Sequence, residues 1–132
     1  MRPTTVLALI LSSALLLSAP GCYSSASAGA GDAAATFNKA TGNLTATTNS
    51  TLDAAFDAAQ GAMNDMGYST SEAKKDYLQG IIKAREADGG LVSVELERKA
   101  DKVTQIEVGV GAFGNESKAR LILEKILARL GR

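Results

Sequence analysis

Two stretches of the chain repeat apolar residues at helical spacing. The first covers residues 50–66 and the second covers residues 115–130. Their apolar positions are Leu52, Ala55, Phe56, Ala59, Ala62, Met63 and Met66, and then Ala119, Ile122, Leu123, Ile126, Leu127 and Leu130. Spacings of three and four residues are typical of a helix that buries one face. The pattern predicts two amphipathic helices, which Ser50 or Thr51 and Asn115 are suited to cap.

Elsewhere apolar and polar residues alternate, as in strands with one buried face. Such segments cover residues 68–74, 78–87, 91–99 and 103–112, and a weaker one covers residues 43–49. The predicted inward positions are Leu78, Gly80, Ile82 and Ala84; Val92, Val94 and Leu96; and Thr104, Ile106, Val108 and Val110. The order β-α-β-β-β-β-α predicts an α+β fold. Its expected form is a two-layer sandwich with an antiparallel sheet of four to five strands and two helices on one face.

The hairpin between residues 78 and 99 has a predictable register. Residues directly opposite each other share a face of the sheet. A three-residue loop that ends at Gly90, in the left-handed conformation, pairs Ala84 with Val94 and sets Ile81 opposite Glu97. Ile81 is then an apolar side chain on the charged face, and we expect it to be available for a surface contact.

The first 22 residues have the layout of a secretory signal peptide. Arg2 precedes an apolar run over residues 6–17, and small residues then lead to Cys22, the only cysteine of the chain. The run is shorter than the ~20 residues that span a membrane. The layout resembles a bacterial lipoprotein signal and predicts a signal peptide over residues 1–21 with lipid attached to Cys22. A non-lipid signal ending at Ala26-Ser27-Ala28 is the alternative.

Residues 22–39 contain the lipidated Cys22 and are rich in Ala, Ser and Gly. This composition predicts a flexible tether, and a short helix over residues 32–40 is the alternative. Residues 40–132 are then a single α+β domain, because the chain has enough residues for one core.

Composition excludes several kinds of function. The chain has 14 Lys and Arg against 14 Asp and Glu, and this balance gives no electrostatic reason to bind nucleic acid. It has no His, the commonest general base and metal ligand. We therefore expect no enzyme activity, no cofactor and no metal site.

One glycine-rich segment spells G-x-G-x-x-G, from Gly109 to Gly114. A dinucleotide site would need a further parallel strand and an acidic residue ~20 positions later, and the given sequence ends at Arg132. The glycines predict instead a tight turn from strand to helix, with Phe113 filling the edge of the core. The free N–H groups at the start of the helix offer an alternative, a small-molecule or anion site. That site would use the loop over residues 111–117, with Gly111, Gly114, Asn115, Glu116 and Ser117.

Five segments together resemble a family of small bacterial lipoproteins of unknown function. They are residues 51–67, a predicted helix that ends in Met-Gly before Tyr68, then Gly80-Ile81-Ile82-Lys83-Ala84, Asp88-Gly89-Gly90, Leu91-Val92-Ser93-Val94-Glu95-Leu96 and Gly109-Val110-Gly111-Ala112-Phe113-Gly114-Asn115-Glu116. The resemblance covers about residues 41–130, together with the signal and the tether. It implies a lipid-anchored protein that faces the periplasm, and it implies no substrate or catalytic residue. Tyr23 follows Cys22 where Asp is usual for retention in the inner membrane, which favours the outer membrane.

We therefore expect a periplasmic lipoprotein that is attached to the membrane through lipid on Cys22. Its expected role is that of a non-enzymatic interaction module, which binds another protein or component of the cell envelope.

Overall fold

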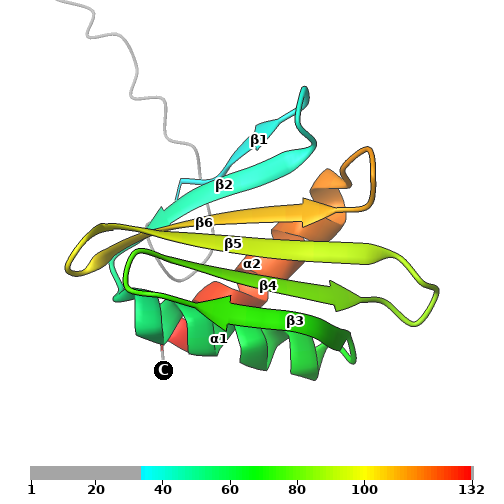
Figure 1. The fold of residues 1–132 in the computed structure, drawn as a ribbon. Helices are drawn as coiled ribbons and strands as arrows, with labels where there is room; N and C mark the ends of the chain where they lie inside the picture. The colour runs from blue at the N-terminus through cyan, green and yellow to red at the C-terminus, as the bar shows by residue number, and fades with distance from the viewer. Residues whose placement is uncertain (1–33, 132) are drawn as a thin grey trace, which may run out of the picture.

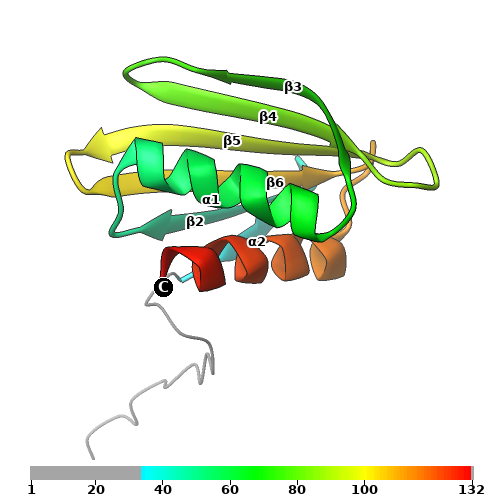
Figure 2. The same ribbon diagram turned by 90° about the horizontal axis from the view of Figure 1, so that it is seen from below.

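The computed structural model describes residues 34–131, which form one antiparallel sheet with two helices packed on one of its faces (Figures 1 and 2). The strands are β1 (Thr36–Asn38), β2 (Asn43–Thr48), β3 (Ser69–Lys75), β4 (Gln79–Arg85), β5 (Leu91–Ala100) and β6 (Val103–Val110). The helices are α1 (Leu52–Asp65) and α2 (Glu116–Leu130). The strand order across the sheet is β1-β2-β6-β5-β4-β3. The predicted α+β two-layer sandwich is confirmed, with six strands rather than four to five.

The additional strand is β1, which lies within the segment predicted as tether. Thr36 pairs with Thr45 and Asn38 with Asn43. The side chain of Asn38 starts the turn, since its Oδ1 accepts a hydrogen bond from the amide of Ala40 at 2.9 Å. The alternative of a helix over residues 32–40 is therefore wrong at residues 36–38. A strand of three residues is too short to show a period in the sequence.

Helix α1 buries the predicted apolar stripe against the sheet. Thr51 is its N-cap, and the Oγ1 of Thr51 accepts a hydrogen bond from the amide of Ala54 at 3.2 Å. Its buried residues are Leu52, Ala55, Phe56, Ala58, Ala59, Ala62 and Met63. Met66 follows the end of the helix and is only partly buried.

Helix α2 begins at its predicted cap. Asn115 precedes it, and the Oδ1 of Asn115 accepts a hydrogen bond from the amide of Lys118 at 3.0 Å. Ala119, Ile122, Leu123 and Ile126 are buried beneath the helix. Figure 2 shows the two helices side by side in front of the sheet, on the same face of it. Both apolar stripes therefore contribute to one core.

Two side chains predicted to lie in the core are exposed. Phe113, predicted to fill the edge of the core, is 96% exposed in the loop between β6 and α2. Leu78, predicted to face inward, is 61% exposed. Leu78 precedes β4 because Asp76 caps the turn: its Oδ1 accepts hydrogen bonds from the amides of Leu78 at 2.7 Å and Gln79 at 2.9 Å.

The register of β4 and β5 also differs from the prediction. Ala84 pairs with Val92 rather than Val94, and Ile81 lies opposite Glu95 rather than Glu97. Each residue nevertheless keeps its predicted face, because the difference is two residues and side chains alternate with a period of two.

The β4–β5 loop explains this difference. It has three residues as predicted, but they are residues 87–89, since the amide of Glu86 donates to the carbonyl of Gly90 at 2.8 Å. Gly89, at φ 90°, takes the left-handed position that was predicted for Gly90. Asp88 supports the loop by accepting a hydrogen bond from the amide of Gly90 at 3.0 Å, and this bond lowers the pKa of the Asp88 carboxyl.

Candidate functional site

The predicted lipidation site, Cys22, lies outside the described residues, as do the predicted signal peptide and most of the predicted tether. Within residues 34–131, neither helix has the length and apolar character needed to cross a membrane. In the same residues, no cluster of three or more Asp, Glu, Cys or His side chains is arranged to hold a metal ion.

The predicted loop site is a tight connection between β6 and α2. Gly111 and Gly114 have φ values of 69° and 77°, which explains the need for glycine at both positions. Gly114 also lies against Gly42 in the β1–β2 turn: a Cβ on Gly114 would come within 2.4 Å of the Gly42 Cα. The loop is thus fixed by backbone packing against a turn that is distant in the sequence.

Two polar side chains of this loop, Asn115 and Glu116, have partners within the protein. The side chain of Asn115 occupies the amide of Lys118, and Ser117 is exposed. Glu116 places its own carboxylate at the first turn of α2 and pairs with Arg120 at 2.7 Å. A carboxylate at this position repels other anions. The loop geometry therefore gives no support to the anion-binding alternative.

The first lysine after the loop in the sequence, Lys118, is also engaged. Its Nζ donates to both carboxylate oxygens of Glu86, at 2.9 and 2.7 Å. This pairing raises the pKa of Lys118. Tyr68 donates a hydrogen bond to the same carboxylate at 3.0 Å, and burial together with this bond raises the pKa of Tyr68. The Tyr68–Glu86–Lys118 group joins β4 to the start of α2 and serves the fold.

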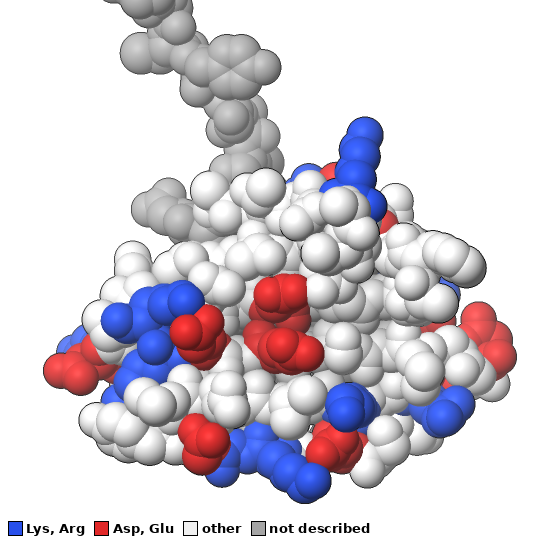
Figure 3. Space-filling view, turned by 45° about the horizontal axis from the view of Figure 1, so that its top comes forward, with Lys and Arg blue, Asp and Glu red and all other residues white. Residues whose placement is uncertain are grey.

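The face of the sheet opposite the helices carries the second group of candidates. No helix or strand from residues 34–131 covers it, and we call it the open face (Figure 1). Its central side chains are Glu72, Lys74, Ile81, Lys83, Ser93, Glu95, Glu97, Gln105, Glu107, Asn43 and Thr45. Figure 3 shows acidic side chains near the middle of this face and most of the basic ones toward its margins.

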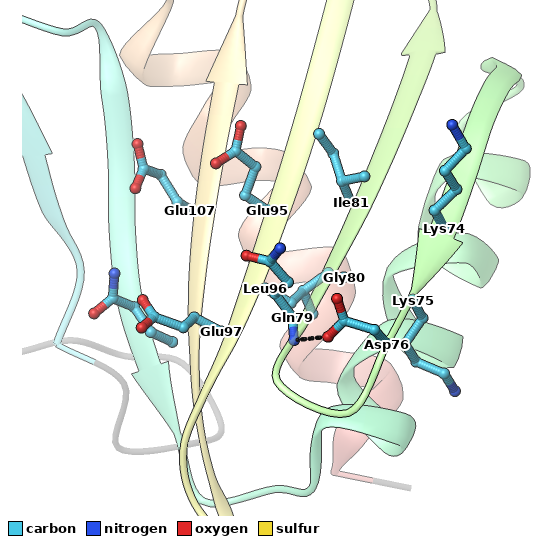
Figure 4. Close-up of a pocket in the computed structure, with 11 residues that line it drawn as sticks. Lys74, Lys75, Asp76, Gln79, Gly80, Ile81, Glu95, Leu96, Glu97 and Glu107 are labelled. Carbon is cyan, nitrogen blue, oxygen red and sulfur yellow. Dashed lines mark hydrogen bonds between the residues drawn. The ribbon is translucent and has the colours of Figure 1, made fainter.

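A hollow of about 450 Å³ lies on the open face, which we call the central hollow. Strands β3 to β6 line it, and the lining includes Asp76, Ile81, Glu95, Glu97 and Glu107. Figure 4 shows Ile81 beside Glu95 on neighbouring strands, with the carboxylates of Glu95 and Glu107 standing on the same side of the sheet. The lining has four carboxylates against two lysines, Lys74 and Lys75, and its apolar side chains are Ile81 and Leu96.

Two of the carboxylates in the hollow face each other directly. Glu95 and Glu107 are paired residues in the β5–β6 register. Like charges directly opposite each other destabilise a sheet. Glu107 accepts a hydrogen bond from the Nδ2 of Asn43 at 2.5 Å, but among residues 34–131 neither carboxylate forms an ion pair with a Lys or Arg.

The lysines of the hollow are paired with other carboxylates. Lys74 binds Glu72 at 2.8 Å, and Lys75 binds Asp53 of α1 at 2.5 Å. Lys83, which lies beside the hollow, also binds Glu72, at 2.9 Å. The bonds from Lys74 and Lys83 lower the pKa of Glu72 to about 2. These pairs leave the charge of Glu95 and Glu107 uncompensated.

The sequence placed Glu95 outward and identified Ile81 as a surface contact, but it did not bring Glu107 to them. The alternation of side chains along the strands could have placed Glu107 on the same face. Leu96 and Ile106 both face the core, so Glu95 and Glu107 fall on the same outer face. The register itself depends on an irregularity between Arg98 and Ala100, and no residue type marks that position in the sequence.

Comparison with curated proteins finds no match for this chain. A family model described as "Protein of unknown function (DUF3568)" matches residues 5–129. Because the match covers nearly the whole sequence, the chain belongs to the DUF3568 family of proteins of unknown function.

Proposed function

We propose that this protein is a lipid-anchored interaction module that faces the periplasm and uses the open face to bind another component of the cell envelope. The observation that carries the proposal is the central hollow on a sheet face that no element of residues 34–131 covers. A hollow of this size is within the range of binding sites on proteins. The proposed role is non-enzymatic.

The sequence of the first 22 residues supports the anchor. A short apolar run ends in small residues directly before Cys22, as in signals that direct lipid to a cysteine. Stable anchoring takes more than one acyl chain, and the lipoprotein modification implied by the resemblance supplies several. Tyr23 after Cys22 favours the outer membrane over the inner membrane.

The lowered pKa values of Glu72 and Asp76 have structural causes. Lys74 and Lys83 lower the pKa of Glu72, and the amides of Gln79 and Leu78 lower the pKa of Asp76. Both shifts arise from contacts that stabilise turns and strand pairs. A general acid or base would need a pKa moved toward neutrality instead.

The outer strands of the sheet favour the open face over an edge as the binding surface. At one edge of the described sheet, β1 has only three residues. At the other edge, β3 has an irregularity between Thr70 and Glu72 and ends in Lys74 and Lys75. Short strands, bulges and lysines are the features that oppose pairing with a further strand.

The anchor is tested by Cys22→Ser. In cells, the native protein should fractionate with membranes and its intact mass should include acyl chains on Cys22. The variant should lose the lipid mass and either appear in the soluble fraction or retain its signal peptide. A native chain that begins at Gly29 without lipid would contradict the anchor.

The binding surface is tested by photo-crosslinking in cells. A photoreactive phenylalanine analogue at Ile81 reports on the open face, and the same analogue at Glu124, exposed on α2, is the matched control. We expect a defined adduct from position 81 and none from position 124. The reverse result would show that the helical face is the interface.

A further inference from the structure

We propose that the partner of the open face is a positively charged protein segment, which places a Lys or Arg side chain between Glu95 and Glu107. This inference rests on the proposed use of the open face and names the chemistry of what binds there. The proposal is based on charge complementarity. Among residues 34–131, Glu95 and Glu107 in the middle of this face form no ion pair with a Lys or Arg.

The facing pair of Glu95 and Glu107 is the first observation. Two carboxylates held opposite each other on adjacent strands repel, and the only hydrogen bond to either of them within residues 34–131 is the one from Asn43 to Glu107. A cation placed between them removes the repulsion and gains an attraction to both. The site is therefore more favourable for a cation than a single exposed carboxylate would be.

The neighbouring charges strengthen the acidic character of the hollow. Asp76 and Glu97 also line it. Glu97 is bound by Lys99 at 2.7 Å, and the lysines in the lining, Lys74 and Lys75, are held by Glu72 and Asp53. A partner therefore meets a negative centre whose local cations already have partners.

Ile81 fits the aliphatic part of a lysine or arginine. It is partly exposed and lies directly opposite Glu95, with Lys74 on its other side. A long basic side chain can lay its methylene groups on an apolar surface while its charged end reaches a carboxylate. Ile81, Glu95 and Glu107 lie next to one another on β4, β5 and β6 (Figure 4). Together they offer an apolar surface and then two carboxylates to one basic side chain.

The proposal is tested with the full lipidated chain in a neutral detergent and a labelled ten-residue peptide of alternating Lys and Ala. Fluorescence anisotropy measures the affinity. Glu95→Gln and Glu107→Gln should each weaken binding about three- to fivefold, and the double variant should weaken it about tenfold or more. Binding should also weaken as salt rises.

The controls separate charge at this site from net charge and from folding. Glu124→Gln removes the same charge from α2 and should leave the affinity unchanged. A peptide of alternating Glu and Ala should not bind. Because Gln at position 95 or 107 removes repulsion, each single variant should unfold at the same or a higher urea concentration than the native protein.

Several results would overturn the proposal. They are unchanged affinity in the double variant, an equal loss from Glu124→Gln, or equal binding of the acidic peptide. Spermidine is tested in place of the peptide in the same assay. If it binds as tightly and loses affinity equally in the variants, the proposed protein segment is rejected in favour of a polyamine. If position 81 gives adducts in cells but the basic peptide does not bind, the open face remains the interface. The proposal that its partner is positively charged is then rejected.

Discussion

Gly80 determines how closely α1 approaches the sheet. A Cβ at this position would lie 2.7 Å from the Cδ2 of Phe56, so the ring rests directly on the backbone of β4. The Nζ of Lys75 lies 5.2 Å from the centre of the same ring, and Phe56 is only 6% exposed. One aromatic side chain thus fills the space between α1, β3 and β4.

We expect Phe56→Ala to lower the free energy of unfolding by about 3–5 kcal/mol, because it removes a buried aromatic ring and leaves a cavity. Asp57→Ala, the next residue but exposed on α1, should change it by less than about 0.5 kcal/mol. Urea unfolding measures both. Equal small effects would mean that the ring of Phe56 does not fill the core as described.

Glu72 provides a prediction about pH. The pKa of its carboxyl is lowered from 4.5 to about 2 by Lys74 and Lys83. The ionised carboxylate therefore stabilises the folded protein above about pH 4.5, and this contribution is lost as the pH falls toward 2. Stability should fall over this range in the native protein, and less steeply in Glu72→Gln.

The measurement is urea unfolding at several pH values between about 6 and 2.5. The difference between the native protein and Glu72→Gln should shrink as the pH falls, and it should also shrink at high salt, because the pairs are exposed. A difference that is constant with pH would contradict the assigned pairing.

At the scale of elements, the β1–β2 turn is joined to the loop before α2. Gly42 and Gly114 approach so closely that neither position has room for a Cβ. Gly111, three residues earlier in the same loop, also has a positive φ, but a Cβ there would have no atom within 4 Å. Substitutions at Gly111 and Gly114 can therefore distinguish the cost of the left-handed backbone conformation from the cost of close backbone packing.

Gly111→Ala should cost about 1–2 kcal/mol, which is the penalty for a side chain in the left-handed conformation. Gly114→Ala should cost more, because the backbone of Gly42 must also move. Thermal or urea unfolding of the two variants gives the comparison. Equal losses would show that the turn and the loop are not packed against each other.

At the scale of the whole molecule, periodicity was sufficient for the architecture. The apolar stripes of α1 and α2 and the alternation in β4, β5 and β6 are long enough to define a period, and they placed two helices on one face of an antiparallel sheet. The inward faces of Ile82, Val94 and Ile106 followed from the same alternation.

Features set by contacts between distant segments were not predictable in the same way. β1 has three residues and depends on pairing with β2. Three adjacent residues, Asp88, Gly89 and Gly90, all suit a turn, so the sequence did not fix which residues form the loop. Phe113 was assigned to the core on hydrophobicity alone, yet it lies in a loop that is held by glycine contacts instead.

The candidate site was predictable only in part. Ile81 and Glu95 were assigned to the outer face from alternation. Their meeting with Glu107 depends on the β5–β6 register. The ion pairs of Lys75 with Asp53 and of Lys83 with Glu72 join different elements, so they cannot be read from any one segment of the sequence.

The position of β1 has a mechanical consequence. The chain enters the fold through this three-residue edge strand, so a pull on the preceding residues loads β1 before any other element. Release of residues 36–42 would free a segment that, fully extended, spans at most about 23–25 Å at 3.3–3.6 Å per residue. Because Gly42 packs against Gly114, this release would also separate the β1–β2 turn from the loop before α2.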